Sequence, residues 1–249
     1  MLGSGMFSRV ADAILPLHCA LCESPLVASE RGTGLCAYCL AAVPGIGVSR
    51  CPRCALRIVP GQPCPCIAAS TPAFDAALAG CDYAPPLDRL LLAFKFGAQL
   101  GLAMPLAALL PTPPPRTADG RPAAILVPMP LAPGRLAERG FNQSTLLARR
   151  LARRSGLTCD VRLLERHGER PAQFRAGKDA RLRNQQGAFS LRRSCPDAVI
   201  LLVDDVMTTG ATLHEAAMAL KSGGARRVIA LVVARTPGAA DRVAAHPKR

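Results

Sequence analysis

The chain has 249 residues, half of them hydrophobic, and a formal net charge of +14 at neutral pH. It is long enough for one large domain, or for a medium-sized domain joined to a small one, and its apolar content is ample for a packed core. No apolar run reaches the roughly 18 residues of a membrane-spanning helix, and the apolar run at 11–17 is too short for a signal peptide. We therefore expect a cytoplasmic protein with no membrane span.

The first 66 residues contain eight of the eleven cysteines, which is unusual in a cytoplasmic protein unless they bind metal. They form three Cys-x-x-Cys pairs and one Cys-x-Cys pair. Two such pairs complete a tetrahedral Zn²⁺ site with Zn–S distances of about 2.3 Å, so four pairs suit two sites. Iron–sulfur ligation fits the same spacing. The expected ligands, paired in sequence order, are Cys19, Cys22, Cys36 and Cys39 for the first site and Cys51, Cys54, Cys64 and Cys66 for the second.

A segment this short and this poor in large apolar residues depends on metal to fold, so the zinc is expected to be structural. The other cysteines, Cys81, Cys159 and Cys195, are isolated and are expected to be small buried or half-buried residues. Residues 69–72 have the composition of a linker. We therefore predict a Cys-rich zinc module over residues 1–70 and an α/β domain over residues 71–249.

Beyond the linker, apolar strands alternate with helices, which is typical of an α/β fold. Asn142 and Gln143 begin a helix, where they either cap it or contact a ligand. Gly223 and Gly224 end the last helix, and a right-handed crossover makes the strands on either side of it parallel. Residues 111–121 contain four prolines and are expected to form a surface loop. Strands are predicted at 77–83, 124–127, 157–164, 199–203 and 228–234, and helices at 87–96, 100–110, 142–154 and 213–222.

Much of the positive charge lies in the middle of this domain. Residues 135–193 contain 15 Lys and Arg against 5 Asp and Glu, a net charge of +10. Such a concentration favours an anionic partner, either a polyphosphate or a nucleic acid. The alternative is a solvated surface in an arginine-rich proteome, because Arg outnumbers Lys by 27 to 4, which suggests a coding bias. Both explanations remain open.

The stretch 199–212 contains the clearest chemical signal. An apolar strand ends on Asp204 and Asp205, and a loop rich in hydroxyl groups leads into a helix. The free N–H groups and the dipole of a helix N-terminus attract a phosphate, and Gly210 lets it approach the backbone closely. The two carboxylates can accept hydrogen bonds from vicinal ribose hydroxyls, directly or through Mg²⁺. The stretch therefore predicts a site for a ribose 5-phosphate, against the alternative of a buried strand with an acidic turn and a capped helix.

An apolar strand followed by Asp-Asp-x-x-Thr-Thr-Gly-x-Thr resembles the phosphoribosyl pyrophosphate (PRPP) motif of type I phosphoribosyltransferases. With the cysteine pairs ahead of this motif, the chain resembles the ComF/GntX family, whose members join a double zinc ribbon to a phosphoribosyltransferase-like domain. Similar blocks lie at residues 92–97 and 127–143. The resemblance extends from Cys19 to Arg235, with a departure at Arg170, where the family usually has Thr. A further block matches at Arg166, Gln173, Arg183, Asn184 and Phe189.

The resemblance implies a type I phosphoribosyltransferase-like parallel sheet with flanking helices, and PRPP bound together with Mg²⁺. Asp204 and Asp205 would be the catalytic acids. Arg135 and Arg139, on a loop after a strand, would bind the pyrophosphate, which suits paired guanidinium groups. Residues 166–184 would form a flap that closes over the substrate, or else a plain solvated hairpin. The expected PRPP-binding residues are Asp204, Asp205, Val206, Met207, Thr208, Thr209, Gly210, Ala211, Thr212, Arg135 and Arg139.

Two functions remain open for such a chain. The first is Mg²⁺-dependent transfer of a phosphoribosyl group from PRPP to an unidentified acceptor, a glycosyltransferase reaction, in the context of competence and DNA utilisation. It mainly requires positioning and stabilisation of the leaving pyrophosphate, so the lack of an evident general base does not exclude it. The second is a non-catalytic accessory of DNA uptake that binds single-stranded DNA and DNA-uptake proteins, with PRPP as a ligand or regulator. The absence of Trp and the total of nine Phe and Tyr residues argue against an extended base-stacking surface.

Overall fold

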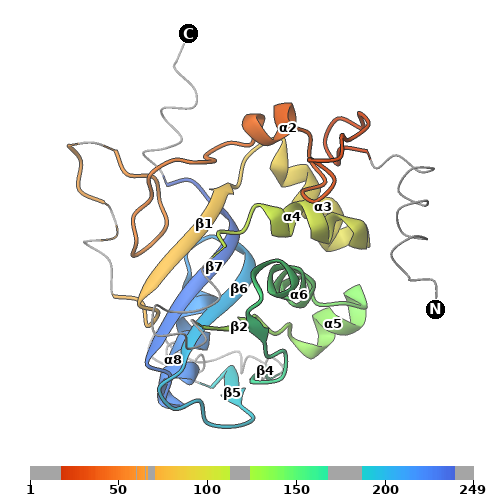
Figure 1. Cartoon of the computed structure of the whole chain (residues 1–249). Helices are drawn as coiled ribbons and strands as arrows, with labels where there is room; N and C mark the ends of the chain where they lie inside the picture. The colour runs from red at the N-terminus through yellow and green to blue at the C-terminus, as the bar shows by residue number, and fades with distance from the viewer. Residues whose placement is uncertain are drawn as a thin grey trace, which may run out of the picture.

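The computed structural model describes residues 18–59, 61–64, 66, 71–112, 124–167 and 187–238. At the centre of the molecule, five strands form one sheet in the order β1-β7-β6-β2-β3 (Figure 1). Each neighbouring pair of strands is parallel. This confirms the predicted α/β fold with a parallel sheet. The strands are β1 (Ala76–Asp82), β2 (Ile125–Pro128), β3 (Thr158–Cys159), β6 (Val199–Met207) and β7 (Arg227–Arg235).

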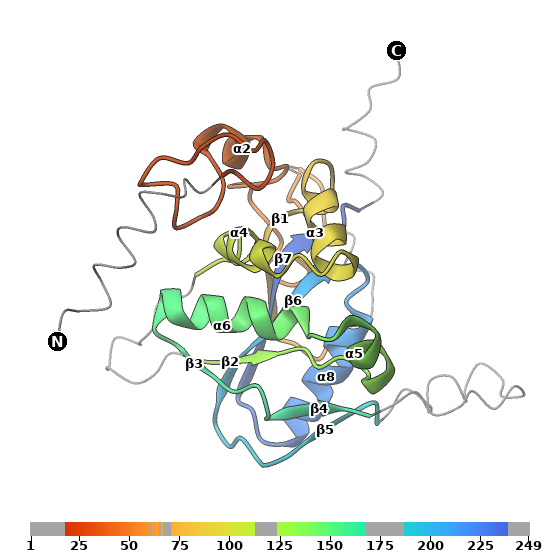
Figure 2. The same cartoon turned by 90° about the vertical axis from the view of Figure 1, so that its right-hand side faces the viewer.

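Long apolar runs place β6 and β7 inside the sheet, because a strand covered on both faces needs apolar residues at nearly every position. Alternate residues of β6 contribute to two separate cores: Leu201 and Val203 to one, Ile200 and Leu202 to the other. None of the helices in the described ranges is long and apolar enough to cross a membrane. The first core is covered by α3 (Leu87–Phe96), α4 (Ala103–Ala108) and α6 (Gln143–Ser155), and the second by α8 (Ala211–Ser222) (Figure 2).

Three elements differ in kind from the predicted ones. The helix predicted at 100–110 is a 3₁₀ turn, η2 (Leu100–Leu102), followed by α4, so that Pro105 lies in the first turn of a new helix, where its missing N–H is tolerated. The strand predicted at 157–164 is replaced by β3 and by β4 (Leu164–Arg166), which pairs with β5 (Phe189–Leu191) in a separate antiparallel hairpin. Finally, the expected loop after β2 contains a helix, α5 (Pro133–Arg139), which starts at a proline and ends at a left-handed glycine.

The cysteine-rich segment packs directly on the α/β part. Its regular structure is limited to the short helix α2 (Ala37–Ala42) and two isolated β-bridges within the described residues. Leu26, Leu35 and Val43 are nevertheless buried, and they belong to the same core as α3 and α4. The two parts therefore share a hydrophobic core. The predicted division after residue 70 falls at 67–70, outside the described residues, and stays a prediction.

Candidate functional site

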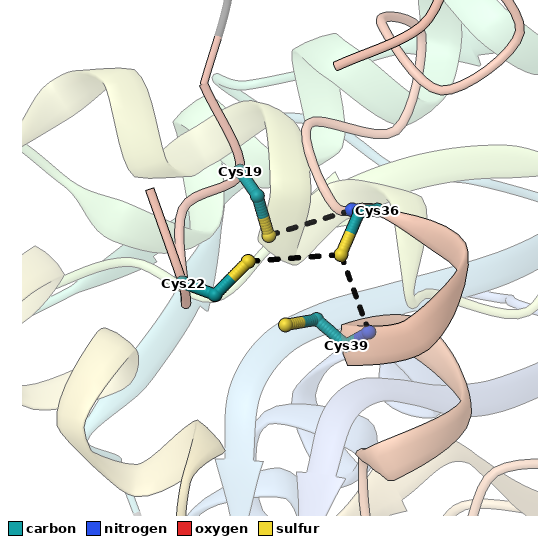
Figure 3. Close-up of side chains that lie close together, drawn as sticks. All are labelled: Cys19, Cys22, Cys36 and Cys39. Atoms are coloured by element: carbon teal, nitrogen blue, oxygen red, sulfur yellow. Dashed lines mark hydrogen bonds between the residues drawn. The ribbon is translucent and has the colours of Figure 1, made fainter. Parts of the chain in front are cut away.

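The eight predicted metal ligands gather into two groups of four, in sequence order. In the first group, Cys36 caps α2, and its Sγ lies 3.7 Å from Cys22 Sγ (Figure 3). The backbone N–H groups of Cys36 and Cys39 donate to Cys19 Sγ and Cys36 Sγ, each at 3.4 Å. Figure 3 shows the four sulfur atoms turned toward one another. Such N–H donation stabilises the thiolate form that binds metal.

The second group has similar spacing. Cys51 Sγ lies 3.7 Å from Cys66 Sγ, and Cys54 Sγ lies 3.4 Å from Cys64 Sγ. A tetrahedron of sulfurs with Zn–S bonds of about 2.3 Å has sulfur–sulfur edges of about 3.8 Å, so both groups fit a zinc ion with small adjustments. All eleven cysteines are free thiols. The structure thus brings the predicted ligands together as two Cys₄ groups that suit a metal.

In each group at least one thiol is already poised to ionise. The hydroxyl and the backbone N–H of Ser24 lower the pKa of Cys22 to about 6. Burial acts to raise the pKa of Cys51, but hydrogen bonds from the backbone N–H groups of Arg53 and Cys54 and from the thiols of Cys64 and Cys66 together lower that pKa to about 7. Because metal binds the thiolate, both groups have a ligand that is readily available near neutral pH.

The two carboxylates of the PRPP motif lie inside β6 and not after it. The predicted end at residue 203 is too early, because β6 pairs with β7 as far as Met207. Asp205 is buried, and its Oδ2 lies 2.9 Å from Lys95 Nζ at the end of α3. Asp204 is half-buried, and its Oδ1 accepts hydrogen bonds at 2.9 Å from the Ser144 hydroxyl of α6 and from the Asp205 N–H. Both acids are therefore held by helices that cover the same face of the sheet.

Asp204 holds its proton more tightly than a free carboxyl group does. Burial, together with the negative charge of Asp205, raises the pKa of Asp204 to about 7. The Ser144 hydroxyl and the Lys95 ammonium act in the opposite direction and only partly compensate. Asp204 is therefore still partly protonated near neutral pH, and a cation that binds beside it would favour loss of the proton.

The loop after β6 ends in a left-handed glycine, Gly210, directly before α8. Gly210 has a φ of +84°, a backbone angle that favours glycine. Helix α8 starts at the next residue, and its first N–H groups have no partner within the helix. This arrangement offers N–H groups and hydroxyls to a bound anion. The exposed residues of the loop and the helix start are Thr208, Thr209, Ala211 and Thr212.

The two predicted pyrophosphate arginines lie on α5. This helix follows β2, and the Met129 N–H donates to the Val203 carbonyl at 2.8 Å, so the β2–α5 connection runs beside β6. Arg135 is exposed, and the Arg139 guanidinium lies 4.7 Å from the ring centroid of Phe96. Figure 2 shows α3, α5 and the start of α6 beside the ends of β2 and β6. The acids, the loop and the arginines thus share the carboxyl end of the sheet, where open α/β sheets bind ligands.

Two contacts at this end come from residues to which the sequence assigned no role, Lys95 and Ser144. The block at 92–97 contained Lys95, but only the fold reveals its partner. Asn142 caps α6 and accepts a hydrogen bond from the Thr145 N–H at 3.2 Å. Of the two predicted roles for Asn142, capping and ligand contact, the structure shows capping. The flap predicted at 166–184 lies outside the described residues from 168 onward, and this part includes Arg170, Gln173, Arg183 and Asn184.

Comparison with known proteins agrees with this geometry. A model of the phosphoribosyl transferase domain matches residues 137–249. The chain is 34% identical to DNA utilization protein YhgH of Salmonella typhi, over 89% of this chain and 98% of that protein. It is 28% identical to competence protein F of Haemophilus influenzae, over 85% of this chain and 93% of that protein. It is also 40% identical to competence protein ComFC of Bacillus subtilis, over 40% of this chain and 39% of that protein.

The parallel sheet, the acidic strand with its loop and the matched domain define a protein of the phosphoribosyltransferase type with two N-terminal Cys₄ groups. The chain belongs to the ComF/GntX family of competence and DNA utilization proteins, as its motifs predicted.

Proposed function

We propose that this chain binds PRPP together with Mg²⁺ at the loop after β6 and transfers its phosphoribosyl group to an acceptor. The observation that supports this most is the succession of Asp204 and Asp205 in β6, the exposed loop at Gly210 and the N-terminus of α8. A 5-phosphate suits the helix N-terminus, and a ribose diol suits the two carboxylates. Mg²⁺ would neutralise part of the pyrophosphate charge.

Each part of PRPP has a matching part of the site. Asp204 and Asp205 would accept hydrogen bonds from the ribose hydroxyls, either directly or through the cation. Arg135 and Arg139 would bind the pyrophosphate from α5, as paired guanidinium groups do for phosphates. The loop residues Val206, Met207, Thr208, Thr209, Gly210, Ala211 and Thr212 would surround the 5-phosphate with backbone N–H groups and hydroxyls.

In the transfer, a nucleophilic atom of the acceptor forms a bond to C1 of the ribose. The bond from C1 to the pyrophosphate oxygen breaks, and pyrophosphate leaves with the electron pair. The proton that the acceptor loses passes to water or to the departing pyrophosphate. The chain contributes mainly by holding both reactants and by stabilising the leaving group, the two contributions that such a reaction needs most.

The test is calorimetric titration of the whole protein with PRPP and Mg²⁺, followed by a pyrophosphate-release assay over candidate acceptors. The double variant Asp204→Asn with Asp205→Asn should bind PRPP at least about 100-fold more weakly, because both ribose contacts lose their charge. Asp160→Asn, which changes a carboxylate on the loop after β3, is the matched control and should bind normally. A double variant that binds as tightly as the unmodified protein would contradict the proposal.

We further propose that each Cys₄ group binds one structural zinc ion. We also propose that residues 1–70 and 71–249 form the two units of the chain, and that the protein acts in the cytoplasm. The sulfur–sulfur separations of 3.4 to 3.7 Å support the first point. The names of the relatives support a role in DNA uptake or DNA utilisation. Proteins of that process are then its expected partners.

A second candidate function is binding of single-stranded DNA, with PRPP as a ligand or regulator. A cavity of about 270 Å³ lies between α4, α6 and the loop at Gly32, and Arg150, Arg153 and Arg154 form part of its wall. Clustered arginines of this kind suit backbone phosphates. A DNA affinity that falls with salt, together with no pyrophosphate release, would favour this function over transfer.

A further inference from the structure

The last residue of β7, Arg235, joins the second Cys₄ group to the loop after β6. Its side chain is buried, with 8% of the residue exposed. Its Nε donates to the Cys54 carbonyl at 2.8 Å. Its Nη1 donates to the Met207 carbonyl at 3.0 Å and also to the Thr208 carbonyl. One rigid guanidinium therefore contacts a turn that bears metal ligands and the loop proposed to bind phosphate.

The contact with the loop determines where its N–H groups point. A peptide unit is planar and trans, so the carbonyl of one residue and the N–H of the next point in opposite directions. Because Arg235 binds the carbonyls of Met207 and Thr208, the N–H groups of Thr208 and Thr209 are turned away from the guanidinium. An anion site needs N–H groups in such a fixed orientation. Arg235 thus fixes the orientation of these two N–H groups.

The contact at Cys54 is with a tightly organised turn. The Ala55 N–H donates to the Cys51 carbonyl, and the Cys51 N–H donates to the Leu56 carbonyl, both at 2.8 Å. Ala55 is fully buried and has a positive φ of 57°. Such a turn keeps its shape when its two cysteines share a metal ion and loses that constraint when they do not. The position of the Cys54 carbonyl therefore depends on whether the second Cys₄ group holds its metal.

We propose that Arg235 is a positioning residue that couples metal binding by the second Cys₄ group to the affinity of the loop for PRPP. This rests on the proposed function, since it takes PRPP as the ligand of the loop. Coupling between two sites acts equally in both directions. Metal in the second group raises the affinity for PRPP, and bound PRPP raises the affinity of that group for its metal by the same factor.

The experiment compares four single variants of the whole zinc-loaded protein, two that test the coupling and two that serve as controls. Arg235→Lys keeps the charge but cannot donate to Cys54 and to the loop at once, because lysine lacks the planar fork. Cys66→Ser removes one ligand of the second group and leaves Arg235 in place. Cys22→Ser does the same to the first group and is the matched control. Arg227→Lys, an exposed arginine at the other end of β7, controls for substitution in the strand.

Two readouts are measured. The first is the dissociation constant of PRPP with Mg²⁺ by calorimetry. It should rise about tenfold in Arg235→Lys and in Cys66→Ser, and it should rise no further when both changes are combined. The second is the affinity of the second group for zinc, measured by competition with a coloured chelator at equilibrium. PRPP should raise this affinity in the unmodified protein and in Arg227→Lys, but not in Arg235→Lys.

The outcomes separate the two proposals. If the unmodified protein does not bind PRPP, the proposed function is wrong and the coupling fails with it. If PRPP binds but the effects of Arg235→Lys and Cys66→Ser are additive, or if Cys22→Ser weakens binding as much as Cys66→Ser does, the coupling alone is wrong. If Arg235→Lys does not fold, the effect of PRPP on zinc affinity in the unmodified protein, compared between the two Cys₄ groups, decides the question.

Discussion

The ammonium group of Lys95 lies 2.9 Å from a carboxylate oxygen of Asp205, and this ion pair joins the end of α3 to β6. Both side chains are shielded, with 22% of Lys95 and 10% of Asp205 exposed. An acid of the proposed ligand site therefore already has a cationic partner before any ligand arrives. Removing the lysine would leave a buried carboxylate beside a second acid, Asp204.

We expect Lys95→Met to lower the free energy of unfolding by about 2 kcal/mol at neutral pH, because the remaining carboxylate loses its partner. Urea unfolding measures this. Lys221→Met is the matched control, since Lys221 pairs with Asp75 at a more exposed position and should cost less than about 1 kcal/mol. Equal losses in the two variants would show that the Lys95 pair has no special shielding.

Asp204 should make stability fall as pH rises. Its pKa is about 7 in the folded protein, whereas an unfolded aspartate has a pKa near 3.9. Between these values the folded state holds more protons, so the contribution of Asp204 is complete below about pH 4 and is lost as pH rises through about 7. Asp204→Asn removes this dependence of stability on pH.

Relative to the unmodified protein, Asp204→Asn should therefore gain stability across this pH window, by up to about 4 kcal/mol. Urea unfolding at pH 5 and at pH 8 measures the difference. Asp197→Asn, at an exposed position with positive φ where asparagine is tolerated, controls for the loss of one acid. A difference that does not change with pH would refute the assignment of the retained proton to Asp204.

Purified protein should contain about two zinc ions per chain, because each Cys₄ group provides a complete tetrahedral ligand set. Cys51→Ser should lose one of them, as measured by elemental analysis. Cys195→Ser, which changes a buried cysteine outside both groups, should keep both ions. Protein that contains neither zinc nor iron when purified in the absence of chelators would rule out a metal role for the cysteines.

If the chain binds single-stranded DNA, the exposed face of α6 should contribute. Changing Arg149, Arg150 and Arg153 to Gln should weaken binding and lower the salt dependence of the logarithm of affinity by about 2, since three phosphate contacts are lost. The affinity for PRPP should change little. Filter binding at several salt concentrations measures this. Undiminished binding by the triple variant would point to the cysteine-rich segment as the DNA contact.

Arg154 of the same helix makes contacts within the protein and serves as the comparison. It donates to the Leu110 carbonyl at 2.8 Å and to the Thr112 hydroxyl at 2.6 Å. It therefore holds the chain after α4 against α6, a role that helical spacing alone does not reveal. Arg154→Gln should lower the free energy of unfolding by more than it weakens the free energy of DNA binding.

Local patterns in the sequence predicted two kinds of feature: the elements that bury apolar residues, and the side chains whose spacing is typical of metal ligands. The apolar runs of β6 and β7, the apolar face of α6 and the cysteine pairs are of this kind. The helix α5 was not predicted, because it buries none of its residues and has only Pro133 and Gly140 as signals. The end of β6 was misplaced because pairing with β7 overrides the low strand preference of aspartate.

The contacts that organise the candidate site join residues distant in sequence, which no local pattern can show. Lys95 reaches Asp205 only because α3 packs on the same face of the sheet as α6. Arg235 and Cys54 are joined only because the cysteine-rich segment lies against the end of β7. The family resemblance indicated which residues belong to the site, but not how each is held in place.

The position of the cysteine-rich segment has a consequence for the edge of the sheet. β1 is an edge strand, and such a strand offers unpaired N–H groups to other chains. Here the N–H groups of Ala77 and Asp82, near its two ends, donate to the Pro52 and Pro44 carbonyls at 2.8 Å. The segment thus acts as a cover that blocks strand addition. Loss of its fold would convert β1 into a template for aggregation, so that the metal content of a preparation would also determine its solubility.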